Sequence, residues 1–220
     1  MTILALEFSS PQRSVAVLRT DGAVVAAEVV GTGGHGTNAF GMVDQALAEA
    51  KIERELIDVI AVGLGPGSYT GIRAAISLAQ GWQLARRVKL LGVSSAECLA
   101  ALARAKKILG RVSVVIDAQR NEFYLASYEI VTDGWREIMP LKILSLAEVQ
   151  SQTSEGGILI GPEVTKWFPN GRMIFPRAAA LAELAAHRDD FVPGEKLEPV
   201  YLRETNFVKS PPRRPVASGP

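Results

Sequence analysis

The chain has 220 residues, 48% of them hydrophobic and 21% charged, with a formal net charge of +1. This length and composition predict one large or two small globular domains with an ample core. The near-neutral net charge excludes an overall positive charge that would attract nucleic acid or acidic lipid. Cys98 is the only cysteine, which excludes an intrachain disulfide and a cysteine-rich zinc site. No leader-like start and no apolar run of roughly 18 residues is present, so we expect a soluble, cytoplasmic protein without a membrane contact.

The first half of the chain predicts three consecutive strands followed by alternating helices and strands. A turn signal at Asp21-Gly22 joins the second and third strands as a hairpin. Thr37 is a candidate cap for the first helix, and Ser94 or Ser95 for the third. The apolar periods predict strands over residues 3–8, 14–18, 23–30, 57–62 and 89–93. They predict helices over residues 37–50, 70–87 and 95–105.

After Gly110 the pattern restarts in a looser copy, with a second hairpin signal at Asp133-Gly134. We expect strands over residues 112–116, 122–128, 135–144 and 157–160, and helices over 145–152 and 177–187. Two βββαβα-type repeats, the second degenerate, predict an α/β protein with the two-lobed actin-like ATPase (ASKHA) fold. The lobes are expected at residues 1–108 and 109–208. The rest, 209–220, has prolines and no periodicity, which predicts a disordered tail.

The stretch AVGLGPGSYTGIR, residues 61–73, joins a buried strand to a helix through a glycine-dense turn. Glycines there let a backbone approach something closely: a phosphate, another part of the same chain or a second protein. A phosphate-binding P-loop needs a lysine after Gly71, where Ile72 stands. The dinucleotide fingerprint also fails, because Thr70 stands where its third glycine belongs. What remains is a helix N-terminus with Ser68 and Thr70 nearby.

Catalytic and metal chemistry find little support in the residues. His35 and His187 are the only histidines and have no metal-ligand spacing. A cleft with Glu7, Ser68 and Asp117 could serve a small actin-like kinase or hydrolase, but we find no acidic cluster to hold a metal clamp. The polar hairpin from residue 117 to 124 fits a site or a surface salt bridge beside a packed tyrosine. We therefore expect no catalytic residue, cofactor or metal.

The helix after the glycine turn is apolar around much of its girth, which predicts burial on more than one side. The helix over residues 37–50 also carries few charges. Such a pair fits either an internal layer or half of a four-helix interface with another subunit. Arg73 stands in a first helical turn, where the helix dipole disfavours a cation, so we expect it to have a specific acidic partner.

Five segments in order, spanning nearly the whole chain, together resemble the TsaB family, also called YeaZ. They are ILALEFSS, GLGPGSYTGIR with AQGW downstream, LGVSS, IDAQRNEFY and PVYLR. The resemblance implies a subunit of the bacterial machinery that makes threonylcarbamoyladenosine beside the anticodon of tRNAs reading codons that begin with A. The family is similar in fold to the catalytic subunit TsaD but lacks its metal-binding histidine pair, so the resemblance implies a non-catalytic scaffold and activator.

The resemblance also implies partners: a TsaD-type subunit, a TsaE-type ATPase, a homodimer in isolation, and tRNA only through the complex. Carried over to this chain, the partner face comprises His35, Phe40, Met42, Val43, Ala46, Gly67, Ser68, Tyr69, Thr70, Arg73 and Ala75. The chain departs from the family pattern at Glu7, where aspartate is usual, and at Gly41, where proline is common. The loop over residues 31–36 is richer in glycine than usual. The alternative is a small actin-like kinase or hydrolase with its own nucleotide site.

Overall fold

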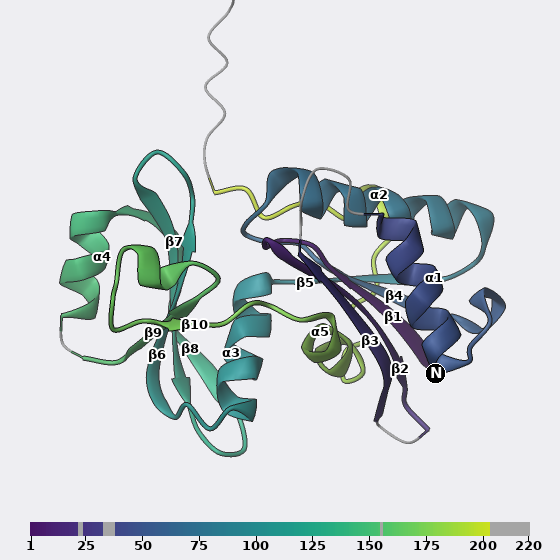
Figure 1. Ribbon diagram of the computed structural model, residues 1–220, viewed down its shortest axis with the longest axis horizontal. Helices are drawn as coiled ribbons and strands as arrows, with labels where there is room; N and C mark the ends of the chain where they lie inside the picture. The colour runs from purple at the N-terminus through teal and green to yellow at the C-terminus, as the bar shows by residue number, and fades with distance from the viewer. Residues whose placement is uncertain (22–23, 33–37, 155, 203–220) are drawn as a thin grey trace, which may run out of the picture.

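Two five-stranded sheets form two lobes within residues 1–21, 24–32, 38–154 and 156–202, the part of the chain that this computed structural model describes (Figure 1). The first sheet has the order β3-β2-β1-β4-β5, and the second, read from the equivalent edge, β8-β7-β6-β9-β10. In each, the first strand pairs antiparallel with the second and parallel with the fourth. The lobes therefore repeat one topology, and the predicted two-lobed actin-like fold is confirmed.

The first lobe follows the predicted order of elements closely. Its strands are β1 (Thr2–Glu7), β2 (Gln12–Arg19), β3 (Val24–Thr32), β4 (Val59–Gly63) and β5 (Lys89–Val93). Its helices are α1 (Ala39–Ala50), the 3-10 turn η1 (Arg54–Leu56), α2 (Tyr69–Ala85) and α3 (Ser95–Ala105). Asn38 caps α1 through its side chain, in place of the predicted Thr37, which lies outside the described residues. Ser94 caps α3, as one of the two predicted candidates.

The second lobe is the shorter copy. Its strands are β6 (Gly110–Asp117), β7 (Glu122–Ile130), β8 (Trp135–Ser145), β9 (Ile158–Gly161) and β10 (Arg172–Met173). Its helical elements are α4 (Leu146–Thr153) and η2 (Val164–Lys166), and α5 (Ala178–Ala185) and η3 (Gly194–Lys196) follow. Three-residue η2 occupies the chain position that 17-residue α2 holds in the first lobe, which accounts for the weaker pattern. None of the described helices is long and apolar enough to cross a membrane.

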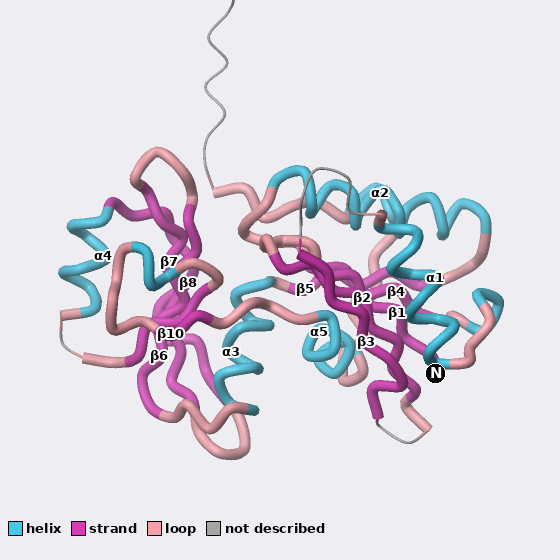
Figure 2. The backbone as a smooth tube through the Cα atoms, in the orientation of Figure 1, coloured by secondary structure: helices cyan, strands magenta, loops and turns pink. Residues whose placement is uncertain are grey.

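Alternate residues of the first sheet build two separate cores. Helices α1 and α2 lie on one side of this sheet and α5 on the other (Figure 2). Leu4 and Leu6 of β1 pack in the core with α1 and α2, whereas Ile3 and Ala5 pack in the core with α5. Helix α3 lies between the lobes, and it contributes to a core on each side. Cys98 of α3 packs with the α5 core and is fully buried.

The C-terminal part of the predicted second lobe, 109–208, packs against the first sheet. Helix α5 packs on β1 and β2, and the following residues 191–202, here called the C-terminal strap, run along β5 and α2. Leu197 of this strap is buried in the core below α1 and α2. Without α5, one face of the first sheet would be exposed, because residues 1–108 supply helices mainly to the other face. The predicted tail, 209–220, lies outside the described residues.

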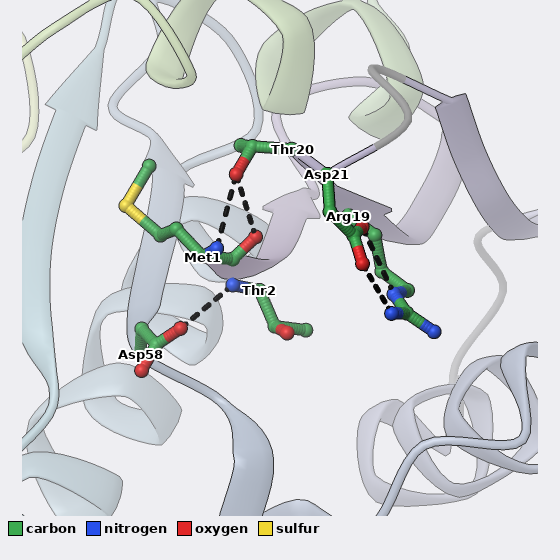
Figure 3. Close-up of polar contacts among 6 residues, drawn as sticks. All are labelled: Met1, Thr2, Arg19, Thr20, Asp21 and Asp58. Atoms are coloured by element: carbon green, nitrogen blue, oxygen red, sulfur yellow. Dashed lines mark hydrogen bonds and ion pairs between the residues drawn. The ribbon is translucent and has the colours of Figure 1, made fainter.

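Polar contacts at the start of the chain hold β1 between its two neighbours (Figure 3). The Met1 amino group donates to Thr20 Oγ1 at 3.0 Å, and the Thr2 backbone N–H donates to Asp58 Oδ2 at 2.8 Å. Thr20 directly follows β2 and Asp58 directly precedes β4. The start of β1 is therefore hydrogen-bonded to both neighbouring strand ends. This register brings the other end of β1, at Glu7, beside the glycine-dense turn.

Candidate functional site

The glycine-dense turn between β4 and α2 packs against the turn that follows β1. The Ser68 N–H donates to the Ser9 carbonyl at 2.6 Å. A Cβ on Gly67 would overlap the Ser9 carbonyl oxygen, and a Cβ on Gly71 that of Phe8. The close approach that these two glycines permit is therefore to the chain's own backbone. Carbonyl oxygens beside a glycine turn also repel a phosphate, because they present the negative ends of their dipoles.

Glu7 links this turn to the start of α3. Its side chain is 0% exposed, and its carboxyl oxygens accept from the Ser9 N–H at 2.8 Å and the Ser95 hydroxyl at 2.9 Å. Burial raises the pKa of Glu7, and the hydrogen bonds from Ser9 and Ser95 oppose that rise. A Cβ on Gly63 would overlap the carboxyl group. Glu7 thus occupies the junction of three segments with no room beside it.

The other members of the proposed kinase or hydrolase cleft are engaged in local structure. Ser68 Oγ accepts from the Gly71 N–H at 3.3 Å as the cap of α2. Asp117 accepts from the backbone and side chain of Gln119, at 2.7 and 3.0 Å, in a turn with three successive left-handed residues. The described residues contain no group of three His, Cys, Asp or Glu side chains able to hold a metal ion. In the adjoining hairpin, Tyr124 packs partly buried against the second-lobe core.

The predicted partner-face residues divide by exposure. His35 lies outside the described residues. The exposed members are Phe40, Tyr69, Thr70 and Arg73, in the first turns of α1 and α2. The members buried in the core between these helices and the first sheet are Met42, Val43, Ala46 and Ala75. The half-buried members are Gly67 and Ser68 in the glycine-dense turn.

The apolar girth of α2 is covered largely by its own chain. The side of α2 that faces the first sheet is buried in one core with it. Its members there include Ile72, Ile76, Leu78 and Ala79. On another side, Gln80 Nε2 donates to the Gly194 carbonyl at 2.8 Å, which ties α2 to the C-terminal strap. An internal layer therefore explains most of the helix composition, and large apolar or aromatic side chains are exposed at its two ends, Tyr69 in the first turn and Leu84 in the last.

A cluster that the sequence did not predict surrounds the first turn of α2. The Tyr69 ring packs against the Tyr201 ring of the C-terminal strap, with 5.8 Å between the ring centroids and the planes tilted by 33°. The Arg73 guanidinium lies 4.9 Å from the centroid of the Tyr69 ring. Arg73 also donates to the Tyr69 hydroxyl. Among the described residues, these contacts replace the acidic partner expected for Arg73. The only sequence signal for Tyr201 was its place in the PVYLR segment.

A cavity of about 1060 Å³ lies elsewhere, between α3, α5 and the turn before β8, and contains none of the predicted site residues. Its larger charged side chains contact other groups of the chain: Arg177 pairs with Glu28, and the Arg104 guanidinium lies 5.4 Å above the Trp135 ring. These contacts hold α5 and the second lobe in place, so we assign the cavity no chemistry.

Known proteins that are similar to this chain belong to the family that its motifs resemble. A family model described as TsaD, tRNA N6-adenosine threonylcarbamoyltransferase, matches residues 30–197. The tRNA threonylcarbamoyladenosine biosynthesis protein TsaB of Escherichia coli is 30% identical, and the alignment covers 96% of this chain and 99% of that protein. TsaB of Haemophilus influenzae is 26% identical over 97% and 98% of the two chains.

Among solved structures, YeaZ from Pseudomonas aeruginosa is similar with a TM-score of 0.79 and 28% identity, covering 91% of this chain and 99% of that one. Similarity in both sequence and fold therefore extends over nearly the full length. Because the TsaD model covers about three quarters of the chain and a full-length relative is 30% identical, the chain belongs to the TsaB (YeaZ) family of tRNA threonylcarbamoyladenosine biosynthesis proteins.

Proposed function

We propose that this protein is a non-catalytic scaffold and activator in the assembly that installs threonylcarbamoyl on the adenosine next to the anticodon. The tRNA substrates are those that read codons beginning with A. The protein pairs with a TsaD-type catalytic subunit, and the pair admits a TsaE-type ATPase. The observation that carries this proposal is the end-to-end similarity to E. coli TsaB, a protein named for the biosynthesis of this modified nucleoside.

The engaged state of the candidate cleft supports a non-catalytic role. Glu7 is buried, Ser68 caps a helix and Asp117 closes a turn, so each group has a structural task. A general base or nucleophile needs to reach a substrate, and a buried, hydrogen-bonded carboxyl group cannot do so without rearrangement. In this proposal the two lobes serve to bind partner subunits and not to catalyse a reaction.

The exposed first turns of α1 and α2 are our candidates for direct contact with the partner. Phe40 is 69% exposed and Tyr69 is 56% exposed, which is unusual for large aromatic side chains. Aromatic and arginine side chains are enriched where protein interfaces gain most of their binding energy, and Arg73 accompanies Tyr69 here. A stable interface buries on the order of 1,600 Å², so the remaining exposed residues of both helices would form its rim. In isolation, two copies of the chain can pair through the same face.

Co-purification with the TsaD-type subunit of the same organism tests this proposal. We expect Phe40→Glu and Tyr69→Glu each to reduce the recovered partner by at least about tenfold, because a buried unpaired charge costs several kcal/mol. Val131→Glu, at an exposed apolar residue of the second lobe, is the matched control and should retain the partner. Charges at Val43 or Ala75 are unsuitable, because these residues are 2% and 0% exposed and a charge there would disrupt the core.

Retention of the partner by both Phe40→Glu and Tyr69→Glu would show that the interface lies elsewhere. Calorimetry with ATP and magnesium tests the alternative of a small actin-like kinase or hydrolase. We expect the isolated protein to show no binding in the low-micromolar range. Tight binding would favour an enzyme with its own nucleotide site.

A further inference from the structure

Tyr201 is held at a defined place by the C-terminal strap, although the strap has little regular structure. The strap pairs with the edge of β5 at Val192, and its Leu197 is buried in the core below α1 and α2. The Val200 N–H then donates to the Leu64 carbonyl at 2.9 Å, next to the glycine-dense turn. The strap therefore runs beside α2 and brings Tyr201 to the first turn of that helix (Figure 1).

Three exposed side chains meet there, and we call them the strap patch: Tyr69 and Arg73 of α2, and Tyr201 of the strap. The two tyrosine rings are in contact, yet Tyr69 remains 56% exposed and Tyr201 49% exposed. Tyrosine and arginine are among the residue types that contribute most binding energy at protein interfaces, because each combines a large contact area with polar groups. The patch therefore has the composition of an interface centre, and it joins segments from opposite ends of the chain.

Arg73 carries a charge that no described carboxylate neutralises. Its guanidinium lies against the Tyr69 ring and donates to the Tyr69 hydroxyl, and among the residues that the structure describes it forms no ion pair. The first turn of a helix disfavours a cation and favours an anion, because the positive end of the helix dipole lies there. A carboxylate supplied by a second molecule would pair with the guanidinium and also interact favourably with the dipole.

We propose that the strap patch is part of the partner face and binds an acidic side chain of the TsaD-type subunit. This inference rests on the proposed function, which makes that subunit the partner of this chain. Tyr69 and Tyr201 supply the apolar contact around the charge pair, and the water that they exclude leaves the ionic hydrogen bonds of Arg73 stronger. The partner face then includes the C-terminal strap in addition to the first turns of α1 and α2.

Titration calorimetry of the full chain with its TsaD-type subunit tests the proposal. The variants Tyr201→Ala and Arg73→Gln each remove one side chain of the strap patch. The controls Leu84→Ala and Arg87→Gln truncate exposed residues at or just beyond the other end of α2. We expect each patch variant to bind at least about tenfold more weakly and both controls to bind like the parent. A rise in ionic strength from about 0.01 M to about 0.15 M should weaken the parent more than Arg73→Gln, because salt screens the charge pair.

Parent-like affinity of either patch variant would overturn the proposal, as would equal weakening by the controls or an equal salt dependence of the parent and Arg73→Gln. If Tyr201→Ala lowers the midpoint of thermal unfolding, Arg73→Gln decides alone, because the Arg73 contacts given above lie within α2. A parent chain that does not bind the TsaD-type subunit would refute the proposed function and this inference with it. If the parent binds and Phe40→Glu releases the subunit while the patch variants do not, the proposed function stands and only this inference fails.

Discussion

The carboxyl group of Glu7 is fully buried, and both of its oxygens accept hydrogen bonds, from the Ser9 N–H and the Ser95 hydroxyl. Desolvation disfavours the charged form, which raises the pKa of Glu7, and the two hydrogen bonds limit that rise. These bonds join β1, the turn after it and α3, so the group stabilises the attachment of α3 to the first sheet.

Glu7 variants should change the pH dependence of stability in a defined direction. The folded-state pKa lies above the unfolded value of about 4.3, so the folded state keeps a proton that the unfolded state loses. The free energy of unfolding therefore falls as pH rises through this window and levels off above the folded pKa. Glu7→Gln does not titrate, and its stability relative to the parent should rise between pH 4 and pH 7.

Glu7→Ala is the companion variant. It should lose about 1–3 kcal/mol throughout, because the Ser9 N–H and the Ser95 hydroxyl lose their acceptor. Urea denaturation of the three proteins at pH 4, 5.5 and 7 measures both effects. A relative stability of Glu7→Gln that falls with rising pH would contradict our assignment, since the carboxylate would then be the preferred form.

Two glycines of α2 give opposite predictions for the same substitution. Alanine is intrinsically better than glycine in a helix by about 1 kcal/mol. Gly81 is exposed and a Cβ added to it would meet nothing within 4 Å, so Gly81→Ala should stabilise the protein by about 0.5–1 kcal/mol. Gly71→Ala should instead destabilise it by at least about 2 kcal/mol, because the new methyl group overlaps the Phe8 carbonyl oxygen. Thermal unfolding of both variants checks the difference, and a stabilised Gly71→Ala would contradict the packing described here.

At the scale of elements, α5 shows how a helix is fixed to a distant strand. Arg177 precedes the first turn of α5, where a cation is unfavourable, but Glu28 of β3 compensates. The Glu28 carboxylate accepts from Arg177 Nε and Nη2 at 3.1 and 2.6 Å, and from the Ala179 N–H at 3.0 Å. The Ala178 N–H donates to Ser14 Oγ at 2.8 Å. Edge strand β3 and its neighbour β2 thus cap α5 in place of a local residue.

Glu28→Ala should therefore weaken the attachment of α5. We expect a loss of about 2–3 kcal/mol in the free energy of unfolding, because Arg177 and the Ala179 N–H both lose a partly buried acceptor. Asp21→Ala is the control: the Arg19–Asp21 pair in Figure 3 is more than half exposed on both sides, and its loss should change stability much less than the loss of Glu28 does. Denaturant titration compares the two, and equal losses would show that the Glu28 contacts add nothing beyond a surface pair.

At the scale of the whole molecule, the two lobes are not independent. The N-terminal sheet takes one of its covering helices and the C-terminal strap from beyond residue 177, and α3 contributes to cores on both sides. One connection between the lobes runs through α3, and the other through the segment before α5. Each of them leads into a helix that is packed in a core of the first sheet. We therefore expect the protein to unfold as a single cooperative unit.

A truncation at residue 108 should fail to fold, although it contains every strand of the first sheet. Removal of α5 exposes Ile3, Ala5, Ala16 and Leu18, and removal of Leu197 opens the opposite core. We expect residues 1–108 to aggregate or to lack a cooperative thermal transition by circular dichroism. Residues 1–202 are the control and should unfold cooperatively. A cooperative transition for 1–108 would restore the simple two-lobe boundary.

The sequence by itself determined the elements and their duplication, because local apolar period and turn residues set them. Residues 89–93 form a strand as predicted, and the hairpins at Asp21 and Asp133 connect antiparallel neighbours. Two-residue β10 was not predicted, because so short a strand has no period. The motif order also identified the family, which the comparisons confirm.

The tertiary structure alone decided what each of these features touches. The glycines of residues 63–71 signalled a close approach, but contact with Phe8 and Ser9 depends on strands β1 and β4 lying side by side. Helical period marked α1 and α2 as apolar without showing that Val43 and Ala75 face the core while Phe40 and Tyr69 face solvent. The glycine-dense turn is a joint packed against its own chain, because burial and hydrogen bonding there link residues far apart in sequence, which no local pattern encodes.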